Sequence, residues 1–141
     1  MKKEYWINVK HVDNRLVIFL KGETIWDSGI IHDDPELDQY INITDHLDKE
    51  HATELIFEGF NDDYAGKESL GELNPWHFHY RLFVRETDGA GNTKETELIK
   101  PYNEKHMSNP NIRAINNSYL LMYKEEGFAV VSNSLSQQFY N

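Results

Sequence analysis

The chain has 141 residues and no cysteine, and its 14 basic and 24 acidic residues give a formal net charge of −10. This length suits one domain with its own hydrophobic core, so residues 1–141 are expected to form a single domain. Without cysteine, disulfide frameworks and thiolate metal sites are excluded. The negative charge argues against nucleic acid and anionic membranes as partners, because both are negatively charged themselves.

The start of the chain does not resemble a targeting segment. Residues 1–3 are followed at once by an alternating pattern rather than by the apolar core of a signal peptide. No apolar run approaches the roughly 20 residues needed to cross a bilayer. We therefore expect a cytoplasmic protein, or one exported by a route that needs no signal peptide.

Alternation of apolar and polar residues indicates half-buried strands near the beginning of the chain. Tyr5, Ile7 and Val9 share one face of the first expected strand. Adjacent Asp and Asn in 12–15 suit a tight turn before the apolar run 16–20. The sequence thus predicts that the first two strands pair as a hairpin.

Further short strands follow up to residue 60. They are expected at 24–26, 39–43 and 53–60, where β-forming residues are bounded by turn residues. Between the last two, Thr44 or Asp45 is predicted to cap a single helical turn.

The clearest strand is predicted from Trp76 to Arg85. Its two faces differ sharply, so one face is expected to be core and the other wet or ligand-facing. The core face would carry Trp76, Phe78, Tyr80, Leu82 and Val84, and the opposite face His77, His79, Arg81 and Arg85.

The last third of the chain contains an expected edge strand and an expected final hairpin. Residues 93–99 suit an edge strand, and exposed edges would allow a homodimer by sheet extension. Prolines and asparagines break any pattern in 100–117. A final hairpin is expected to join 119–123 to 128–131, and the polar tail 132–141 is expected to be loose.

Eight or nine short strands, turn signals about every ten residues and no long helix favour an all-β fold. An antiparallel β-sandwich is preferred to a barrel.

One segment carries a family resemblance. The strings INITDHL at 41–47 and ATELIFEGFN at 52–61 resemble the strand–turn–strand of galactose-binding-like jelly rolls. The resemblance implies that Leu47 plugs the end of the sandwich. The group includes sugar-binding modules and small lectins, some of which hold calcium in loops at one end. The corresponding loop would begin at 61–64.

Candidate ligand residues gather around that loop. Oxygen ligands of the kind that Ca²⁺ takes are offered by Asn61, Asp62, Asp63, Glu72 and Asn74, and Asp62 and Asp63 are the expected ligands if Ca²⁺ is bound. Tyr64 is a further ligand-binding candidate. The alternative is a solvated loop in an acidic protein. Asp33, Asp34 and Glu36 form a second acidic cluster of this kind, but Pro35 and the short span favour a turn there.

Aromatic side chains could stack on sugar rings. Trp6 falls on the strand face opposite Tyr5 and Ile7, which makes it the most suggestive platform. Trp76 is also a ligand candidate, although its position in the alternating pattern predicts core.

His77 and His79 lie on one face of the same predicted strand, as do paired metal ligands in cupin-like β-barrel enzymes. Glu86 has the wrong parity to complete that pattern, and His106 falls in an expected loop. Solvent-facing histidines are the simpler interpretation.

Three functions remain open from the sequence. The first is non-enzymatic, lectin-like carbohydrate binding at residues 61–76, helped by His77 and with calcium as an optional cofactor. The second is a protein-binding adaptor, or an immunity or inhibitor protein, whose acidic surface meets a basic partner. The third is a small metal-dependent β-barrel enzyme that uses His77 and His79. No catalytic sequence motif is recognised.

Overall fold

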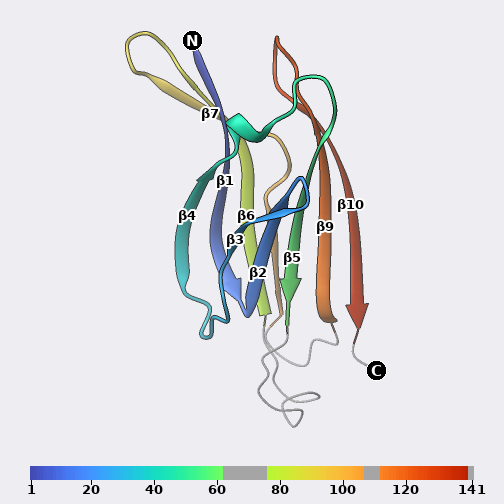
Figure 1. The fold of residues 1–141 in the computed structure, drawn as a ribbon. Helices are drawn as coiled ribbons and strands as arrows, with labels where there is room; N and C mark the ends of the chain where they lie inside the picture. Colours follow the sequence, from blue (N-terminus) through green and yellow to red (C-terminus); the bar gives the residue numbers. More distant parts are fainter. Residues whose placement is uncertain (62–75, 107–111, 140–141) are drawn as a thin grey trace.

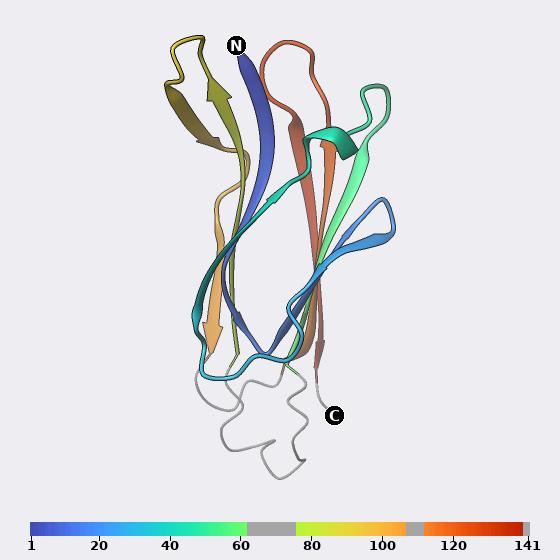
Figure 2. The ribbon, with the colours of Figure 1, turned by 60° about the vertical axis from the view of Figure 1, so that its left-hand side comes forward.

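The computed structural model describes residues 1–61, 76–106 and 112–139, which form a sandwich of two antiparallel sheets (Figure 1). Figure 2 shows the two layers beside each other. The first sheet contains β1 (Lys2–Asp13), β4 (Glu36–Asn42), β6 (Trp76–Thr87), β7 (Thr93–Glu97) and β8 (Tyr102–His106). The second contains β2 (Arg15–Leu20), β3 (Glu23–Asp27), β5 (Thr53–Phe60), β9 (Ile112–Met122) and β10 (Val130–Phe139). The predicted all-β antiparallel sandwich is confirmed, with ten strands in the described ranges.

The order of strands in each sheet shows which elements lie at the centre. In the first sheet β1 lies between β4 and β6, and both β7 and β8 pair with the other side of β6. There β8 covers the first half of β6 and β7 the second half. The second sheet has the order β10-β9-β5-β2-β3. All these pairs are antiparallel.

The core fills the space between the two sheets. The alternation predicted for β6 is confirmed, because its apolar residues from Trp76 to Val84 at even positions are buried against the second sheet. Phe57 of β5 lies flat on Tyr80, with ring centroids 3.8 Å apart. Phe83 is fully buried as well, but on the outer face, where the Arg81 guanidinium covers it at 4.2 Å from the ring centroid.

The predicted hairpin of the first two strands is wrong. β1 and β2 belong to different sheets, and β2 pairs with β3 and β5 instead. Asn14 alone separates the two strands, and it forms an isolated bridge with Ile31. Both Asp13 and Asn14 are buried at this corner, where the Asn14 amide donates to the Asp13 carboxylate. Alternation defines the face of a strand and not its partner, so the sequence could not separate a hairpin from a corner.

A β-bulge changes the faces of β1. The register against β6 shifts between Val9 and His11, so that Val9 lies opposite Tyr80 and His11 opposite His79. Lys10 is the extra residue. Alternation therefore resumes one position later, and Val12 is buried in the core with Val9.

The expected helical turn is present as η1 (Thr44–His46), a single 3-10 turn. Its predicted cap is wrong, because the N-cap residue is Ile43 and no side chain caps the turn. The Thr44 hydroxyl instead accepts a hydrogen bond from the backbone N–H of Tyr5 at 2.8 Å, which ties η1 to β1. Leu47 is buried at the end of the sandwich, as the resemblance implied. Within the described ranges, no helical segment has the length and apolar character needed to cross a bilayer.

The C-terminal third is more regular than expected. The tail is not loose from residue 132, because β10 pairs with β9 up to Phe139. Part of 100–117 is also ordered, since it contains β8 and the start of β9. Residues 132–138 lie at the edge of the sheet and are exposed. Because they need no apolar face, their sequence is mostly polar and lacks the alternation that would predict a strand. Backbone pairing, which leaves no mark on the sequence pattern, holds this strand in place.

Candidate functional site

The predicted ligand loop is only partly described. Asp62, Asp63, Tyr64, Glu72 and Asn74 lie outside the described residues, so the calcium site expected at Asp62 and Asp63 stays a prediction. Asn61, Trp76, His77, His79 and Trp6 can be placed.

Asn61 and Trp76 are structural in this fold. Both are 1% exposed. The backbone N–H of Asn61 donates to the carbonyl of Arg113 at 2.9 Å, joining β5 to β9. The Trp76 ring stacks on Phe78 with centroids 5.6 Å apart. Neither side chain therefore presents an exposed surface on which a sugar could stack.

Trp6 lies on the outer face of the first sheet, as its position in the alternating pattern predicted, and it is half-buried. Its ring meets Tyr40 edge-on at 6.4 Å, and the Arg85 guanidinium lies 5.2 Å from the ring centroid. Arg85 and Arg81 both bind Glu95, at 2.8 and 3.1 Å. Burial raises the pKa of Glu95, but the two arginines outweigh it and hold that pKa below its usual value. The Arg85 guanidinium, paired with Glu95, thus lies over the Trp6 ring.

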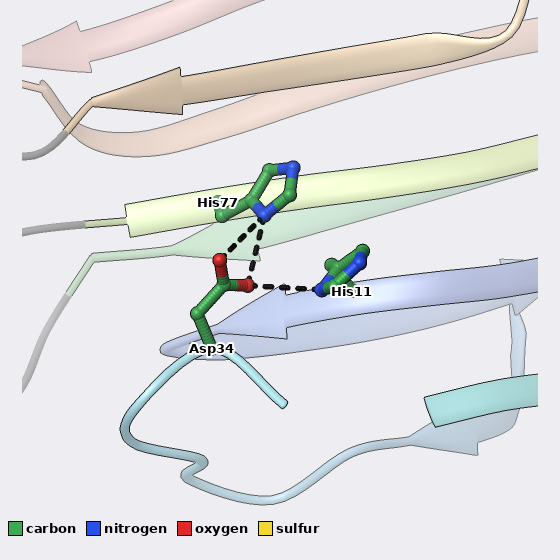
Figure 3. Close-up of side chains that lie close together, drawn as sticks. All are labelled: His11, Asp34 and His77. Carbon is green, nitrogen blue, oxygen red and sulfur yellow. Dashed lines mark hydrogen bonds and ion pairs between the residues drawn. The ribbon is translucent and has the colours of Figure 1, made fainter. Parts of the chain in front are cut away.

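His77 and His79 also point outward from β6, as predicted, and His77 belongs to a compact cluster (Figure 3). Its Nδ1 lies 2.8 and 2.9 Å from the two carboxylate oxygens of Asp34. His11 Nδ1 lies 3.2 Å from Oδ1 of the same carboxylate. The cluster therefore joins β1, β6 and the connection between β3 and β4. One ligand atom from each of His11, Asp34 and His77 lies within 4.8 Å of the others.

Asp34 reaches the sheet from an unusual backbone conformation. Asp33 and Asp34 both have left-handed φ values, 69° and 49°, which Asp tolerates better than most residues. The Lys105 ammonium lies 3.3 Å from Asp34 Oδ2. Burial raises the pKa of Asp34, but the hydrogen bond and charge of His77, with Lys105 and His11, lower it below the usual value. The carboxyl group is therefore ionised at neutral pH.

His79 flanks the cluster without joining it. Its ring lies parallel to the His11 ring, with centroids 6.0 Å apart. Burial lowers the pKa of His79, and the charges of His77, His11, Lys10 and Arg81 lower it further. His79 is therefore neutral near pH 7.

Sequence analysis missed two of the three cluster residues. His11 was placed in no site, because strict alternation from Tyr5 would turn it inward and only the bulge at Lys10 turns it outward. Asp34 was interpreted as part of a turn. The one signal in the sequence was the pair Asp33 and Asp34, because Asp tolerates a left-handed backbone. This signal does not show which strands the carboxylates approach.

A second candidate site lies at the opposite end of the sandwich. It is a pocket of about 570 Å³, which we call the Tyr123 pocket. Segments that are distant in sequence meet here. One of them is 44–47, which belongs to the segment that resembles galactose-binding-like jelly rolls. Its lining residues are Met1, Lys3, Tyr5, Thr44, Asp45, Leu47, Lys49, Glu86, Tyr123 and Glu125.

An aromatic ring with two ammonium groups over it marks this pocket. Lys3 Nζ and Lys49 Nζ lie 5.7 and 5.8 Å from the ring centroid of Tyr123. Lys3 is held in place because its ammonium donates to the carbonyl of Gly127 at 2.7 Å. The Tyr5 ring supports Tyr123 from below, with centroids 6.5 Å apart. The half-buried Tyr123 ring thus has two ammonium groups over it and the Tyr5 ring beside it.

The chain matches no protein-family model, no curated protein and no solved structure. What it binds has to be inferred from its own residues.

Proposed function

We propose that this protein is a non-enzymatic, carbohydrate-binding β-sandwich and that the Tyr123 pocket holds the sugar. The observation that carries the proposal is a pocket of about 570 Å³ with an accessible tyrosine ring in its wall. Small-molecule sites usually occupy about 300–1,000 Å³. Tyrosine combines an apolar ring face, on which the C–H groups of a sugar can pack, with a polar hydroxyl.

The polar groups around the ring suit sugar hydroxyls. Lys3 and Lys49 offer donors, while Asp45, Glu86 and Glu125 offer carboxylate acceptors. A hydroxyl group both donates and accepts, so a mixed set of this kind can bind several hydroxyls of one ring. A few placed polar groups around an apolar surface are typical of small-molecule sites.

Part of the segment that resembles galactose-binding-like jelly rolls lines this pocket, although the resemblance itself points to a loop beginning at 61–64. Residues 44–47 of the string at 41–47 contribute Thr44, Asp45 and Leu47 to its wall. The ligand end proposed here is the one that holds η1, and not the end at which β5 stops and β6 begins (Figure 1).

The test is titration of the isotope-labelled protein with simple sugars, followed by NMR and calorimetry. We expect signals at Tyr123 and Lys49 to shift, and we expect Tyr123→Ala to weaken binding at least tenfold. Tyr123→Phe retains the ring and should bind within about threefold of the wild type. Tyr40→Ala is the matched control, because Tyr40 is an exposed tyrosine on the outer face of the first sheet.

Equal sugar affinity in the wild type and Tyr123→Ala would overturn the proposal. Shifts confined to residues outside the pocket lining would do the same. Thermal unfolding of each variant shows whether a loss of binding comes from a loss of fold.

A protein partner is the second candidate, and one surface favours it. Leu120, Met122 and Val130 are exposed together on the outer face of the second sheet, where Val130 lies opposite Met122. With the charge of −10, this patch would suit a partner with an apolar centre and a basic rim. Affinity that falls steeply with salt would indicate this role, since neutral sugar binding responds little to ionic strength.

A further inference from the structure

We infer that His11, Asp34 and His77 bind a divalent transition-metal ion, with Zn²⁺ as the ion that this ligand set suits best. The site lies at the other end of the sandwich from the Tyr123 pocket and is independent of sugar binding. One ligand atom from each residue lies within 4.8 Å of the others (Figure 3). Zn²⁺ takes His nitrogen and carboxylate oxygen at about 2.0–2.2 Å, so small side-chain movements would place all three around one ion.

The hydrogen bonding of His77 is the strongest indication. Its Nε2 lies 2.7 Å from Oδ1 of Asn103, a carbonyl oxygen that only accepts, so Nε2 carries a proton. Nδ1 faces the Asp34 carboxylate at 2.8 Å, so a metal ion that replaced the proton shared by this pair would lie between the nitrogen and the carboxylate. An oxygen that accepts a hydrogen bond from the non-ligating nitrogen of a histidine is typical of metal sites, because it fixes the tautomer and orients the ring.

The two oxygens of Asp34 have different surroundings. Oδ1 faces both imidazoles, at 2.8 Å from His77 Nδ1 and 3.2 Å from His11 Nδ1. Oδ2 is 2.9 Å from His77 Nδ1 and 3.3 Å from the ammonium of Lys105. Oδ1 can therefore bind the ion while Lys105 holds the other oxygen, an arrangement that orients a monodentate carboxylate.

The ligand types select the class of ion. Two imidazole nitrogens and one carboxylate oxygen suit Zn²⁺ and its first-row neighbours, whereas Ca²⁺ takes six to eight oxygens. Three protein ligands leave a position for water or for an atom of a bound molecule. The site differs from the metal pair expected at His77 and His79, since His11 takes the place of His79 and the ion would lie on the outside of an open sandwich.

The test uses the full chain without a histidine tag, stripped with EDTA and titrated calorimetrically with Zn²⁺ and with Ca²⁺. We expect one Zn²⁺ per chain, a higher melting temperature with Zn²⁺, and no response to Ca²⁺ from these residues. His11→Gln and Asp34→Asn should each weaken Zn²⁺ binding at least tenfold. Asn tolerates the left-handed backbone at position 34, so the second variant should retain the loop.

His51→Gln is the matched control, because His51 is an exposed histidine paired with Asp48 elsewhere on the surface. It should bind Zn²⁺ as the wild type does. His77 itself is left unchanged because it is buried and its loss could disturb the sheet. NMR of the histidine rings gives a second measure, in which His11 and His77 shift with Zn²⁺ and His51 does not.

Two results would overturn the inference. One is the failure of the stripped protein to bind Zn²⁺, which would make the cluster an imidazolium–carboxylate ion pair. The other is unchanged Zn²⁺ affinity in both His11→Gln and Asp34→Asn. The sugar titration uses neither residue, so failure of this site and failure of the Tyr123 pocket are distinguished.

Discussion

The hydroxyl groups of Tyr80 and Tyr119 lie 2.9 Å apart between the two sheets. The Asn117 amide donates to both, at 2.6 and 2.8 Å. Its carbonyl oxygen accepts in turn from the Asn133 amide at 2.6 Å. Tyr80, Tyr119 and Asn117 are all buried, so this network joins β6 to β9 and β10 through polar groups inside an apolar core.

Asn117→Ala should destabilise the protein by about 2–3 kcal/mol, because two buried hydroxyls lose their shared donor and a cavity remains. Chemical denaturation measures this loss as a lower midpoint. Asn116→Ala, in the half-buried neighbour, is the control and should cost about 1 kcal/mol or less. A cost for Asn117→Ala no larger than that of the control would contradict the role of the network.

Alkaline pH should unfold the protein through the same tyrosines. Burial raises the pKa of Tyr80, with the neighbouring Tyr119 adding to it, and burial also raises the pKa of Tyr119. An unfolded tyrosine ionises near pH 10. The contribution of these groups to stability is therefore complete below about pH 10 and is lost as the pH rises above it, since only the unfolded chain then releases protons.

Tyrosinate absorbance and circular dichroism, recorded together against pH, check this expectation. The ionisation of the buried tyrosines should coincide with the loss of secondary structure. Full ionisation of every tyrosine near pH 10, with the fold intact, would show that these side chains reach solvent.

Gly59 has no room for a side chain. A Cβ there would lie 2.7 Å from Cε2 of Phe78, a ring that is buried in the core. Gly59→Ala should therefore destabilise the fold by about 1–3 kcal/mol through overpacking. Gly89→Ala is a matched control, because nothing lies within 4 Å of its Cβ position, and it should change the free energy of unfolding by at most about 0.5 kcal/mol. Equal melting temperatures for the two variants would contradict this packing.

The calcium prediction at Asp62 and Asp63 is tested separately from zinc. If these carboxylates bind Ca²⁺, the EDTA-treated protein should melt at a higher temperature when Ca²⁺ is added, because an ion that binds only the folded state stabilises it. Asp62→Asn with Asp63→Asn should abolish that increase and leave the metal-free melting temperature unchanged. An increase that persists in the double variant would place calcium elsewhere.

Faces were easier to predict than partners. The strand at 53–60 is found as expected, and the inward residues of β6 follow from strict alternation, since a sheet with one face on a core needs that period. The final hairpin was likewise marked by its turn residues, and β9 and β10 do pair. These features are encoded locally, so a single sequence contains them.

The site residues required non-local information. His11 meets His77 only because Lys10 forms a bulge and because β1 pairs with β6, more than sixty residues away. Asp34 arrives through a connection whose left-handed residues leave only a weak sequence signal. The Tyr123 pocket likewise depends on the packing of η1 against the ends of β1 and β9.

The position of β1 between β4 and β6 also affects the order of events during synthesis. β1 is made before its neighbours and can meet β4 early, but its other neighbour, β6, is finished only at Thr87. The second sheet is completed later still, because β5 pairs with β2 on one side and on the other side with β9, which is synthesised much later. Until then apolar faces of both halves stay uncovered, a situation in which nascent β-proteins depend on chaperones. Such non-local pairing is typical of domains that fold in about milliseconds to seconds rather than microseconds.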